Sequence, residues 1–479
     1  MPPTSRRRGD HRNRRPGGPR NTGRPQDLVR RTAFDVIRAV ETRDAYANLL
    51  LPSRLRDRGL TGRDAALATE LTYGTLRGRG TYDAVLALCS DRELRRIDAP
   101  LLDVLRLGAH QILATRIPPH AAVGTAVELA RSVSGPGQAK FANAVLRKVT
   151  TRDLDGWLAI VAPGDADETT RLSIAHSHPK WIVSAMRDAL GPDRDEIAGL
   201  LAADNARPRV TLVARPGRAA LEELYEAGAE PAPYSPYAAV LPDGDPAAVA
   251  AVRDGRAAVQ DEASQLVALA LAAAPLDGAD ARWADLCAGP GGKAGLLSAV
   301  ATERGARLLA ADVQPHRAGL VGRAVDGRAG VVVADGTAPA WRPGSFDRIL
   351  LDVPCTGLGA LRRRPEARWR RGPQAVAELG PLQRSLLASA LDAVRPGGVV
   401  AYVTCSPHLA ETRVVVDDVL HDRERGGDRD GGRVERLDAP SALRTVAPGL
   451  SGVGDGPYAQ FWPHRHGTDA MFLALLRKA

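Results

Sequence analysis

The sequence predicts a multidomain protein in which an all-α domain and a small α+β module precede an α/β domain with a mainly parallel sheet. Three observations carry this prediction. Apolar residues recur at helical spacing over 27–150, strand-like and helical segments mix over 165–255, and short apolar runs alternate with helical stretches over 256–479. Such alternation of strands and helices is typical of a doubly wound sheet.

The chain of 479 residues has a formal net charge of +9, and most of that charge lies at its start. Residues 1–25 contain eight Arg and one Asp, so the remainder carries only about +2. We expect 1–26 to be a disordered basic tail that either solubilises the protein or attracts a nucleic-acid backbone. The longest apolar run, 266–276, is too short to cross a bilayer, and no apolar segment follows the arginines. These features predict a cytoplasmic protein with no membrane partner.

The first domain is expected to be helical and to bind or scaffold, since it contains no obvious nucleophile–base pair. In "APLLDVLRLGAHQILATRIPPH" the apolar residues Leu102, Leu105, Ala109, Ile112 and Leu113 recur at helical spacing. That helix must end at Pro118-Pro119. The segments "AAVGTAVELARSV" and "GQAKFANAVLRKV" continue the pattern.

The middle module is expected to mix strands and helices. "RVTLVA" (209–214) is typical of a strand, "RAALEELYEAG" (218–228) of a helix, and "YAAVLPDG" (237–244) of a short extended segment.

Each predicted strand of the last domain ends in a polar or reactive side chain. The strands are "RWADLCAG", "RLLAADV", "GVVVADGT", "DRILLDVPC" and "GGVVAYVTCS". The side chains in question are Cys287, Asp312, Asp335, Asp352 with Cys355, and Cys405. A single acid after a strand is commonly a helix cap. Polar or reactive side chains at the ends of all five strands instead indicate a functional crevice at the carboxyl edge of the sheet.

The first turn of this domain, "DLCAGPGGKAG" (285–295), fits more than one cofactor. Its segment Gly289-Pro290-Gly291-Gly292 lets the backbone approach a ligand next to a helix N-terminus. The turn also fits the loose G-x-G-x-x-G/A pattern, and Asp312 lies 23 residues beyond Gly289, where a ribose-binding acid belongs. A nicotinamide-dependent oxidoreductase is therefore an alternative.

The cysteines favour a different chemistry. Four cysteines are too few and too scattered for a disulfide framework. We expect Cys89 to be an inert core residue and Cys287 to line the first turn. Cys355 and Cys405 follow two strands, where exposed thiolates are useful nucleophiles. Methylation of carbon 5 of a pyrimidine needs one thiolate, because addition to carbon 6 makes carbon 5 nucleophilic. The residues alone do not rank the two thiols.

The motifs together resemble a known family. "DLCAGPGGKA", "LDVPCTGLGALRRRPEARWR", "YVTCSPHLAET" and "FWPHRHGTDAMF" are similar to those of the Sun/Nop family of RNA 5-methylcytosine methyltransferases. "TRIPPHAAVGTAVELAR" and "KFANAVLRKV" resemble the NusB-like, RNA-binding helical domain of the bacterial 16S ribosomal RNA members. The resemblance implies a Rossmann-like domain, S-adenosylmethionine as cofactor, small-subunit ribosomal RNA as partner and no metal.

The resemblance also implies residue roles. The turn Cys287, Ala288, Gly289, Pro290, Gly291, Gly292 and Lys293 would hold the methionine part of the cofactor. Asp312 would take the ribose hydroxyls, Asp335 would lie beside the adenine, and Asp352 would line the meeting point of cofactor and base. Cys405 would be the nucleophile and Cys355 would help release the product. Lys293 and Asp352 would also contact the flipped cytosine.

Three further segments of the sequence also carry expectations. The run "RRRPEARWRR" (362–371) is expected to contact the RNA backbone through its arginines, and 165–255 resembles a small RNA-binding insert. His464 and His466 lack further ligands and are expected to be structural. Two departures from the family pattern, Val353 and Gly289 in place of alanines, remove no functional group. Alternative functions are the same chemistry on transfer RNA or 23S ribosomal RNA, an NAD-dependent oxidoreductase, and a non-catalytic RNA-binding protein.

Overall fold

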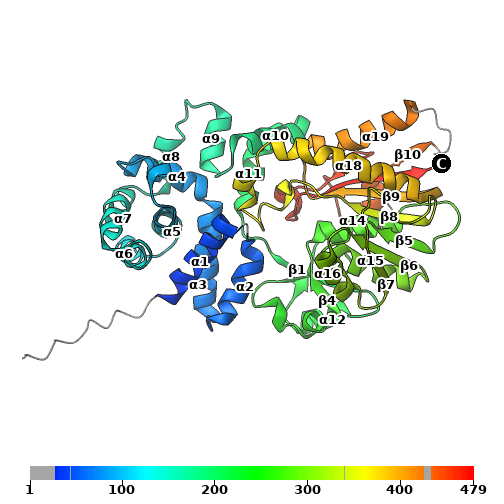
Figure 1. The fold of residues 1–479 in the computed structure, drawn as a ribbon, viewed down its shortest axis with the longest axis horizontal. Coiled ribbons are helices and arrows are strands. Elements are labelled where there is room, and N and C mark those ends of the chain that lie inside the picture. The colour runs from blue at the N-terminus through cyan, green and yellow to red at the C-terminus, as the bar shows by residue number, and fades with distance from the viewer. Residues whose placement is uncertain (1–26, 44, 339, 426–432) are drawn as a thin grey trace, which may run out of the picture.

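The computed structural model describes residues 27–43, 45–338, 340–425 and 433–479. The expected basic tail 1–26 lies outside the described residues. Figure 1 shows the helical domain at one end of the molecule and the large sheet at the other, with a small sheet between them. Within the described ranges, no helix combines the length and the apolar character needed to cross a membrane.

The first domain is helical, as predicted. Its helices are α1 (Leu28–Arg43), α2 (Ala47–Asp57), α3 (Gly62–Arg77), α4 (Arg79–Cys89), α5 (Ala99–Ala114), α6 (Pro119–Ser134) and α7 (Pro136–Val149), with a 3-10 turn η1 (Leu94–Arg96). Helix α5 ends at Ala114, earlier than expected, and Pro119 begins the next helix. Proline suits that first helical position because its missing N–H would have no partner there. Cys89 is buried in this core.

The range 165–255 contains two different structures. Helices α9 (Glu168–Ala175), α10 (Lys180–Leu190) and α11 (Ile197–Asn205) follow α8 (Leu154–Val161). The sheet module begins only at residue 210. It is antiparallel, in the order β2 (Glu230–Pro231), β3 (Ala238–Leu241), β1 (Val210–Ala214) and β4 (Ala257–Val259), with α12 (Leu221–Glu226), η3 (Pro246–Ala248) and α13 (Ala250–Arg253). Its last strand therefore ends beyond residue 255.

The large sheet contains all five predicted strands. These are β5 (Arg282–Asp285), β6 (Arg307–Asp312), β7 (Ala329–Val333), β8 (Phe346–Asp352) and β9 (Val394–Thr404). They are parallel, in the order β7-β6-β5-β8-β9. Antiparallel strands β12 (Phe472–Lys478), β10 (Val434–Leu437) and β11 (Ala459–Gln460) complete the sheet beside β9. The strand order reverses between β5 and β8, which is where an open α/β sheet binds its ligand.

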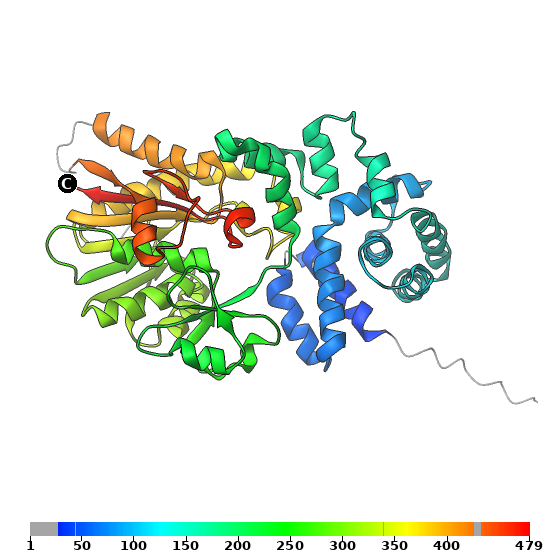
Figure 2. The same cartoon turned by 180° about the vertical axis from the view of Figure 1, so that it is seen from behind.

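Helices cover both faces of this sheet (Figure 1; Figure 2). One face packs against α14 (Glu262–Ala273), α15 (Gly292–Glu303) and α20 (Ala439–Val446), and α16 (Pro315–Val325) lies beside α15. The other face packs against α18 (Gln374–Ala393) and α19 (Arg413–Arg425). Alternate residues of β9 enter the two cores: Val399, Ala401 and Val403 on one side, Val400 and Tyr402 on the other.

Short elements at the carboxyl edge connect the sheet to the other domains. They are η2 (Gly191–Glu196), η4 (Leu358–Ala360), α17 (Ala367–Arg370), η5 (Leu409–Glu411) and α21 (Pro463–His466). Leu358, Leu361 and Trp462 form one apolar cluster with helices α9 to α11.

Candidate active site

The two thiols predicted at strand ends lie together. Strands β8 and β9 are parallel neighbours with Asp352 opposite Val403, so the segments that follow them start at the same edge. The Sγ atoms of Cys355 and Cys405 are 3.4 Å apart, and both side chains are partly exposed. The loop after Cys355 turns back, and Gly359 N donates to the carbonyl of Cys405 at 2.8 Å.

The electrostatics distinguish the two thiols. The hydrogen bond with Cys355 is the largest influence on the Cys405 thiol and lowers its pKa overall. The charge of Lys293 acts in the same direction, whereas burial and the charge of Asp352 oppose it. The same hydrogen bond, together with burial, raises the pKa of Cys355 well above its ordinary value. Because the thiolate is the nucleophilic form of cysteine, these surroundings favour a thiolate at Cys405 over one at Cys355.

Lys293 and Asp352 form an ion pair next to the thiols. Lys293 lies in the first turn of α15 and Asp352 ends β8, and Nζ to Oδ2 is 2.8 Å. Burial alone would lower the pKa of Lys293, but the carboxylate of Asp352 raises it overall. The pair therefore places one fixed positive and one fixed negative charge beside Cys405.

A buried carboxylate fastens the turns that carry both cysteines. Glu411 Oε1 accepts hydrogen bonds from Thr356 N at 2.7 Å and from Gln383 Nε2 at 3.3 Å, and Thr356 Oγ1 donates to its other oxygen. Thr356 Oγ1 also lies 3.3 Å from Ser406 Oγ. Thr356 follows Cys355 and Ser406 follows Cys405, so one carboxylate controls the position of both thiols. The sequence analysis missed Glu411, although it lies in the quoted segment "YVTCSPHLAET".

The glycine-rich turn passes close to two neighbouring elements. Gly291 has φ 112°, and a Cβ there would lie 2.6 Å from the Cβ of Ala324. A Cβ on Gly289 would lie 2.4 Å from Asp312 Oδ2. Glycine is therefore required at position 291 by both conformation and space. At position 289, glycine lets the turn pack directly on Asp312, the candidate for binding the ribose.

Asp312 ends β6 and holds the turn. Its carboxylate accepts from Gly289 N at 3.0 Å and from Gln314 N at 2.9 Å, and Arg317 lies 3.6 Å from it. Asp335 differs: it is exposed beyond β7, and its carboxylate accepts hydrogen bonds from Thr337 that lower its pKa. Cys287 packs against the core, and burial raises the pKa of its thiol. Its thiol is therefore poorly suited to act as a nucleophile.

Asp285, which the sequence analysis did not single out, ends β5 beneath this turn. It is buried, and neither carboxylate oxygen has a hydrogen-bond partner among the described residues. Burial, with a contribution from Asp352, raises its pKa to about 8. Unpaired buried carboxylate oxygens beside a glycine-lined turn suit the positively charged end of S-adenosylmethionine, so the residues present fit that cofactor.

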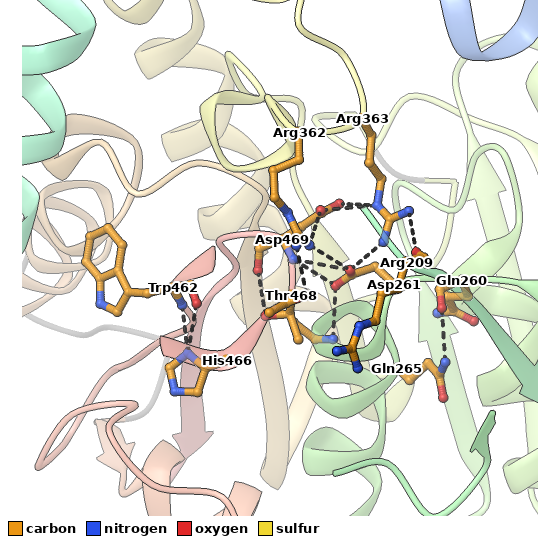
Figure 3. Close-up of polar contacts among 12 residues, drawn as sticks. Arg209, Gln260, Asp261, Gln265, Arg362, Arg363, Trp462, His466, Thr468 and Asp469 are labelled. Atoms are coloured by element: carbon orange, nitrogen blue, oxygen red, sulfur yellow. Dashed lines mark hydrogen bonds and ion pairs between the residues drawn. The ribbon is translucent and has the colours of Figure 1, made fainter. Parts of the chain in front are cut away.

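Several arginines of the run 362–371 bind other parts of the protein. Arg362 and Arg363 bind Asp261 and Asp469 (Figure 3), and Arg368 is fully buried. Arg370 donates to the carbonyls of Val40 and Ala45 in the helical domain.

The guanidinium groups of these four arginines thus join segments of the protein, and contact of the run with RNA stays a prediction. Arg364 and Arg371 are exposed. The two histidines also have separate protein partners: His464 contacts Glu196 at 2.7 Å, and His466 accepts from Trp462 N (Figure 3). No cluster of three or more potential metal ligands occurs in the described ranges.

Comparison with known proteins identifies the family. Residues 270–477 match the profile of the 16S rRNA methyltransferases RsmB/F, and residues 28–151 match the NusB family. A putative methyltransferase of Mycobacterium tuberculosis is 51% identical over 464 residues, which cover 96% of this chain and 98% of that protein. The probable ribosomal RNA small subunit methyltransferase B of Bacillus subtilis is 30% identical, covering 94% and 98%. The chain belongs to the RsmB/F methyltransferase family.

Further comparisons agree with this membership. The ribosomal RNA small subunit methyltransferase B of Salmonella heidelberg is 32% identical over 81% of this chain and 89% of that protein. The crystal structure of the protein PH0851 has a TM-score of 0.75 at 22% identity, over 95% of this chain and 99% of that one. It therefore shares the fold. As an RsmB/F methyltransferase, the enzyme uses S-adenosylmethionine, so the nicotinamide alternative for the glycine-rich turn is set aside.

Proposed function

We propose that this RsmB/F-family enzyme methylates carbon 5 of a cytosine in 16S ribosomal RNA through a covalent bond between Cys405 and carbon 6. The observation that carries the proposal is the thiol pair, in which one sulfur has a lowered pKa and the other donates to it. The 16S target is supported by the names of the relatives from Bacillus subtilis and Salmonella.

The first step is addition of the Cys405 thiolate to carbon 6 of the cytosine. A bond forms between Sγ and carbon 6, and the electron pair of the ring double bond moves toward carbon 5 and the ring carbonyl. The ammonium of Lys293 lies beside Cys405 and can stabilise the negative charge that develops on the ring. Asp352 orients Lys293 and lines the place where the base would lie.

S-adenosylmethionine, when bound, supplies an electrophilic methyl group to carbon 5. We assign the turn 287–293 to its methionine part, Asp312 to its ribose and Asp335 to the adenine side. Asp285, whose unpaired carboxylate lies beneath the turn, is added as a partner for the positive charge. This assignment is supported by the close approach of the turn backbone to Asp312 and to α16.

Release reverses the first bond. The proton on carbon 5 leaves to a base, and the bond between carbon 6 and Sγ breaks to restore the double bond and the Cys405 thiolate. A thiolate leaves more readily when a hydrogen bond stabilises it, and the neutral thiol of Cys355 is placed to donate that bond. This gives Cys355 a physical role in product release.

Bisulfite sequencing tests the target. In a strain that lacks the gene, one cytosine of 16S ribosomal RNA should lose its protection from bisulfite, and a plasmid copy should restore it. If the deletion strain instead loses a protected cytosine in transfer RNA or 23S ribosomal RNA, the proposed reaction would stand but the substrate would be that RNA. No change in any RNA would reject the proposed function.

A further inference from the structure

A cleft of about 660 Å³ lies between the helical domain, the small sheet and the arginine-rich loop. Helices α2 and α3 form one wall, and the start of β1 with the end of β4 forms the other. Arg363 closes one side of the cleft. Its guanidinium is fixed by ion pairs with Asp261 and Asp469 (Figure 3). Neither thiol lines this cleft, so it is distinct from the methylation site.

The lining combines positive charge with an aromatic surface. The guanidinium of Arg77 lies 5.4 Å from the ring centroid of Tyr73, and its Nε is buried with no hydrogen-bond partner among the described residues. Arg207 is exposed at the edge of the cleft, and Val259 is 50% exposed. Guanidinium groups next to an aromatic ring bind the phosphates and bases of single-stranded nucleic acid.

One acid lies among these groups. The carboxylate of Glu70 lies 3.5 Å from His110 Nε2, and the interaction with His110 lowers the pKa of Glu70. Glu70 is therefore charged at neutral pH and can accept a hydrogen bond from a ribose hydroxyl or a base amino group. The cleft thus offers partners for each part of a nucleotide, and its volume is in the range of ligand sites.

Neighbouring residues of the arginine-rich loop connect the cleft with the active site. Arg364 follows Arg363, is exposed, and contributes to lowering the pKa of Cys405. Its guanidinium lies 4.9 Å from the ring centroid of Tyr46, which is 37% exposed. Tyr46 precedes α2, whose Asn48 lines the cleft. An exposed arginine and tyrosine therefore connect the surroundings of the thiols to the cleft.

We propose that this cleft binds the single-stranded nucleotides adjacent to the target cytosine, with Arg77 and Arg207 on the phosphates and Tyr73 against a base. The inference rests on the proposed RNA substrate. A base that enters a catalytic pocket leaves its neighbours unstacked, and a second binding site compensates for that loss. The NusB domain then contributes directly to substrate binding through α3.

The test is a kinetic comparison of two double variants of the full-length enzyme. Arg77→Ala/Arg207→Ala removes the positive groups of the cleft. Arg95→Ala/Arg131→Ala removes two exposed arginines elsewhere in the helical domain, which pair on the surface with Glu93 and Glu128. Methyl transfer to unmodified, in vitro transcribed 16S ribosomal RNA is measured against RNA concentration.

The cleft variant should raise the KM for RNA at least about tenfold, with kcat and the affinity for S-adenosylmethionine unchanged. The control variant should match the wild type. A KM for the cleft variant equal to that of the control would overturn the proposal, as would an equal loss of cofactor affinity.

Photocrosslinking separates this inference from the proposed function. A transcript that contains 4-thiouridine should crosslink to peptides spanning 66–77 and 207–210 in the wild type, and much less in the cleft variant. Crosslinks confined to other peptides would contradict the proposal. If the wild type transfers no methyl group to the transcript, the proposed function fails, and the crosslink map still decides whether RNA occupies the cleft.

Discussion

The ammonium group of Lys293 lies 2.8 Å from the carboxylate of Asp352, and the two charges act in opposite directions on Cys405. Lys293 lowers the pKa of the thiol and Asp352 raises it. The hydrogen bond from Cys355 is the largest influence and lowers the pKa. The pKa of Cys405 therefore depends first on Cys355, then on burial, which raises it, and then on the balance within this ion pair.

Lys293→Met should make Cys405 less reactive near neutral pH. Removing the positive charge leaves Asp352 unbalanced, so the pKa of Cys405 should rise. The rate of Cys405 alkylation by iodoacetamide, followed by mass spectrometry as a function of pH, measures this change. Lys148→Met is the matched control, since Lys148 pairs with Asp91 on the surface of the helical domain. An unchanged pH profile for Lys293→Met would contradict the electrostatic account.

Asp312→Ala should weaken cofactor binding more than Asp335→Ala. Asp312 is buried and its carboxylate holds the turn through Gly289 N, whereas Asp335 is exposed and its carboxylate binds Thr337, outside that turn. We expect a loss of S-adenosylmethionine affinity of at least about tenfold for the first variant and a smaller loss for the second. Isothermal titration calorimetry gives both values, with Asp392→Ala as an exposed control. A larger loss of affinity in Asp335→Ala than in Asp312→Ala would contradict the assignment of Asp312 to the ribose.

Asp285→Asn should stabilise the unliganded enzyme, and more so at higher pH. In the unfolded chain this carboxyl has its ordinary pKa of about 3.9, whereas in the folded protein its pKa is about 8. Between these values the folded state binds more protons, so stability falls as pH rises. An amide at position 285 does not titrate, so the variant does not lose this part of the unfolding free energy as the pH rises.

Denaturant unfolding without cofactor at pH 5, 7 and 8.5 measures the difference between Asp285→Asn and the wild type. It should grow with pH and reach about 2 kcal/mol or more near pH 8. A difference that does not change with pH would mean that Asp285 titrates normally. Asp392→Asn provides the control for an exposed carboxylate.

Glu411→Gln should destabilise the turns that carry the cysteines. The substitution replaces a charged acceptor of hydrogen bonds from Thr356 and Gln383 with an amide that has one acceptor oxygen. The expected cost is about 1–3 kcal/mol of unfolding free energy, together with a lower kcat. Glu378→Gln, at an exposed position of α18, is the control. Wild-type kcat and stability in Glu411→Gln would show that the carboxylate does not position the thiols.

The parts that the sequence predicted best are those set by local pattern. The five parallel strands follow from apolar runs bounded by turns, and the meeting of Cys355 with Cys405 follows because neighbouring parallel strands end at one edge. The helical domain follows from its regular spacing of apolar residues.

The features that the sequence did not predict depend on tertiary contacts. A run such as "RRRPEARWRR" is read as a solvated or RNA-binding surface, because nothing local indicates that Asp261 and Asp469 neutralise Arg362 and Arg363. The burial of Asp285 and Glu411 likewise depends on elements far away in the chain. The sequence does not separate the helices between 168 and 205 from the sheet module, because no strong change of composition marks the boundary.

Trapping a covalent complex tests the central claim most directly. Each cysteine variant is incubated with S-adenosylmethionine and unmodified 16S transcript and then examined on a denaturing gel. Cys355→Ala should accumulate a protein–RNA adduct, since the donor that helps Cys405 leave is missing. Cys405→Ala and the double variant should form none, and Cys89→Ala should behave as the wild type. An adduct formed by Cys405→Ala, together with normal turnover by Cys355→Ala, would contradict the account.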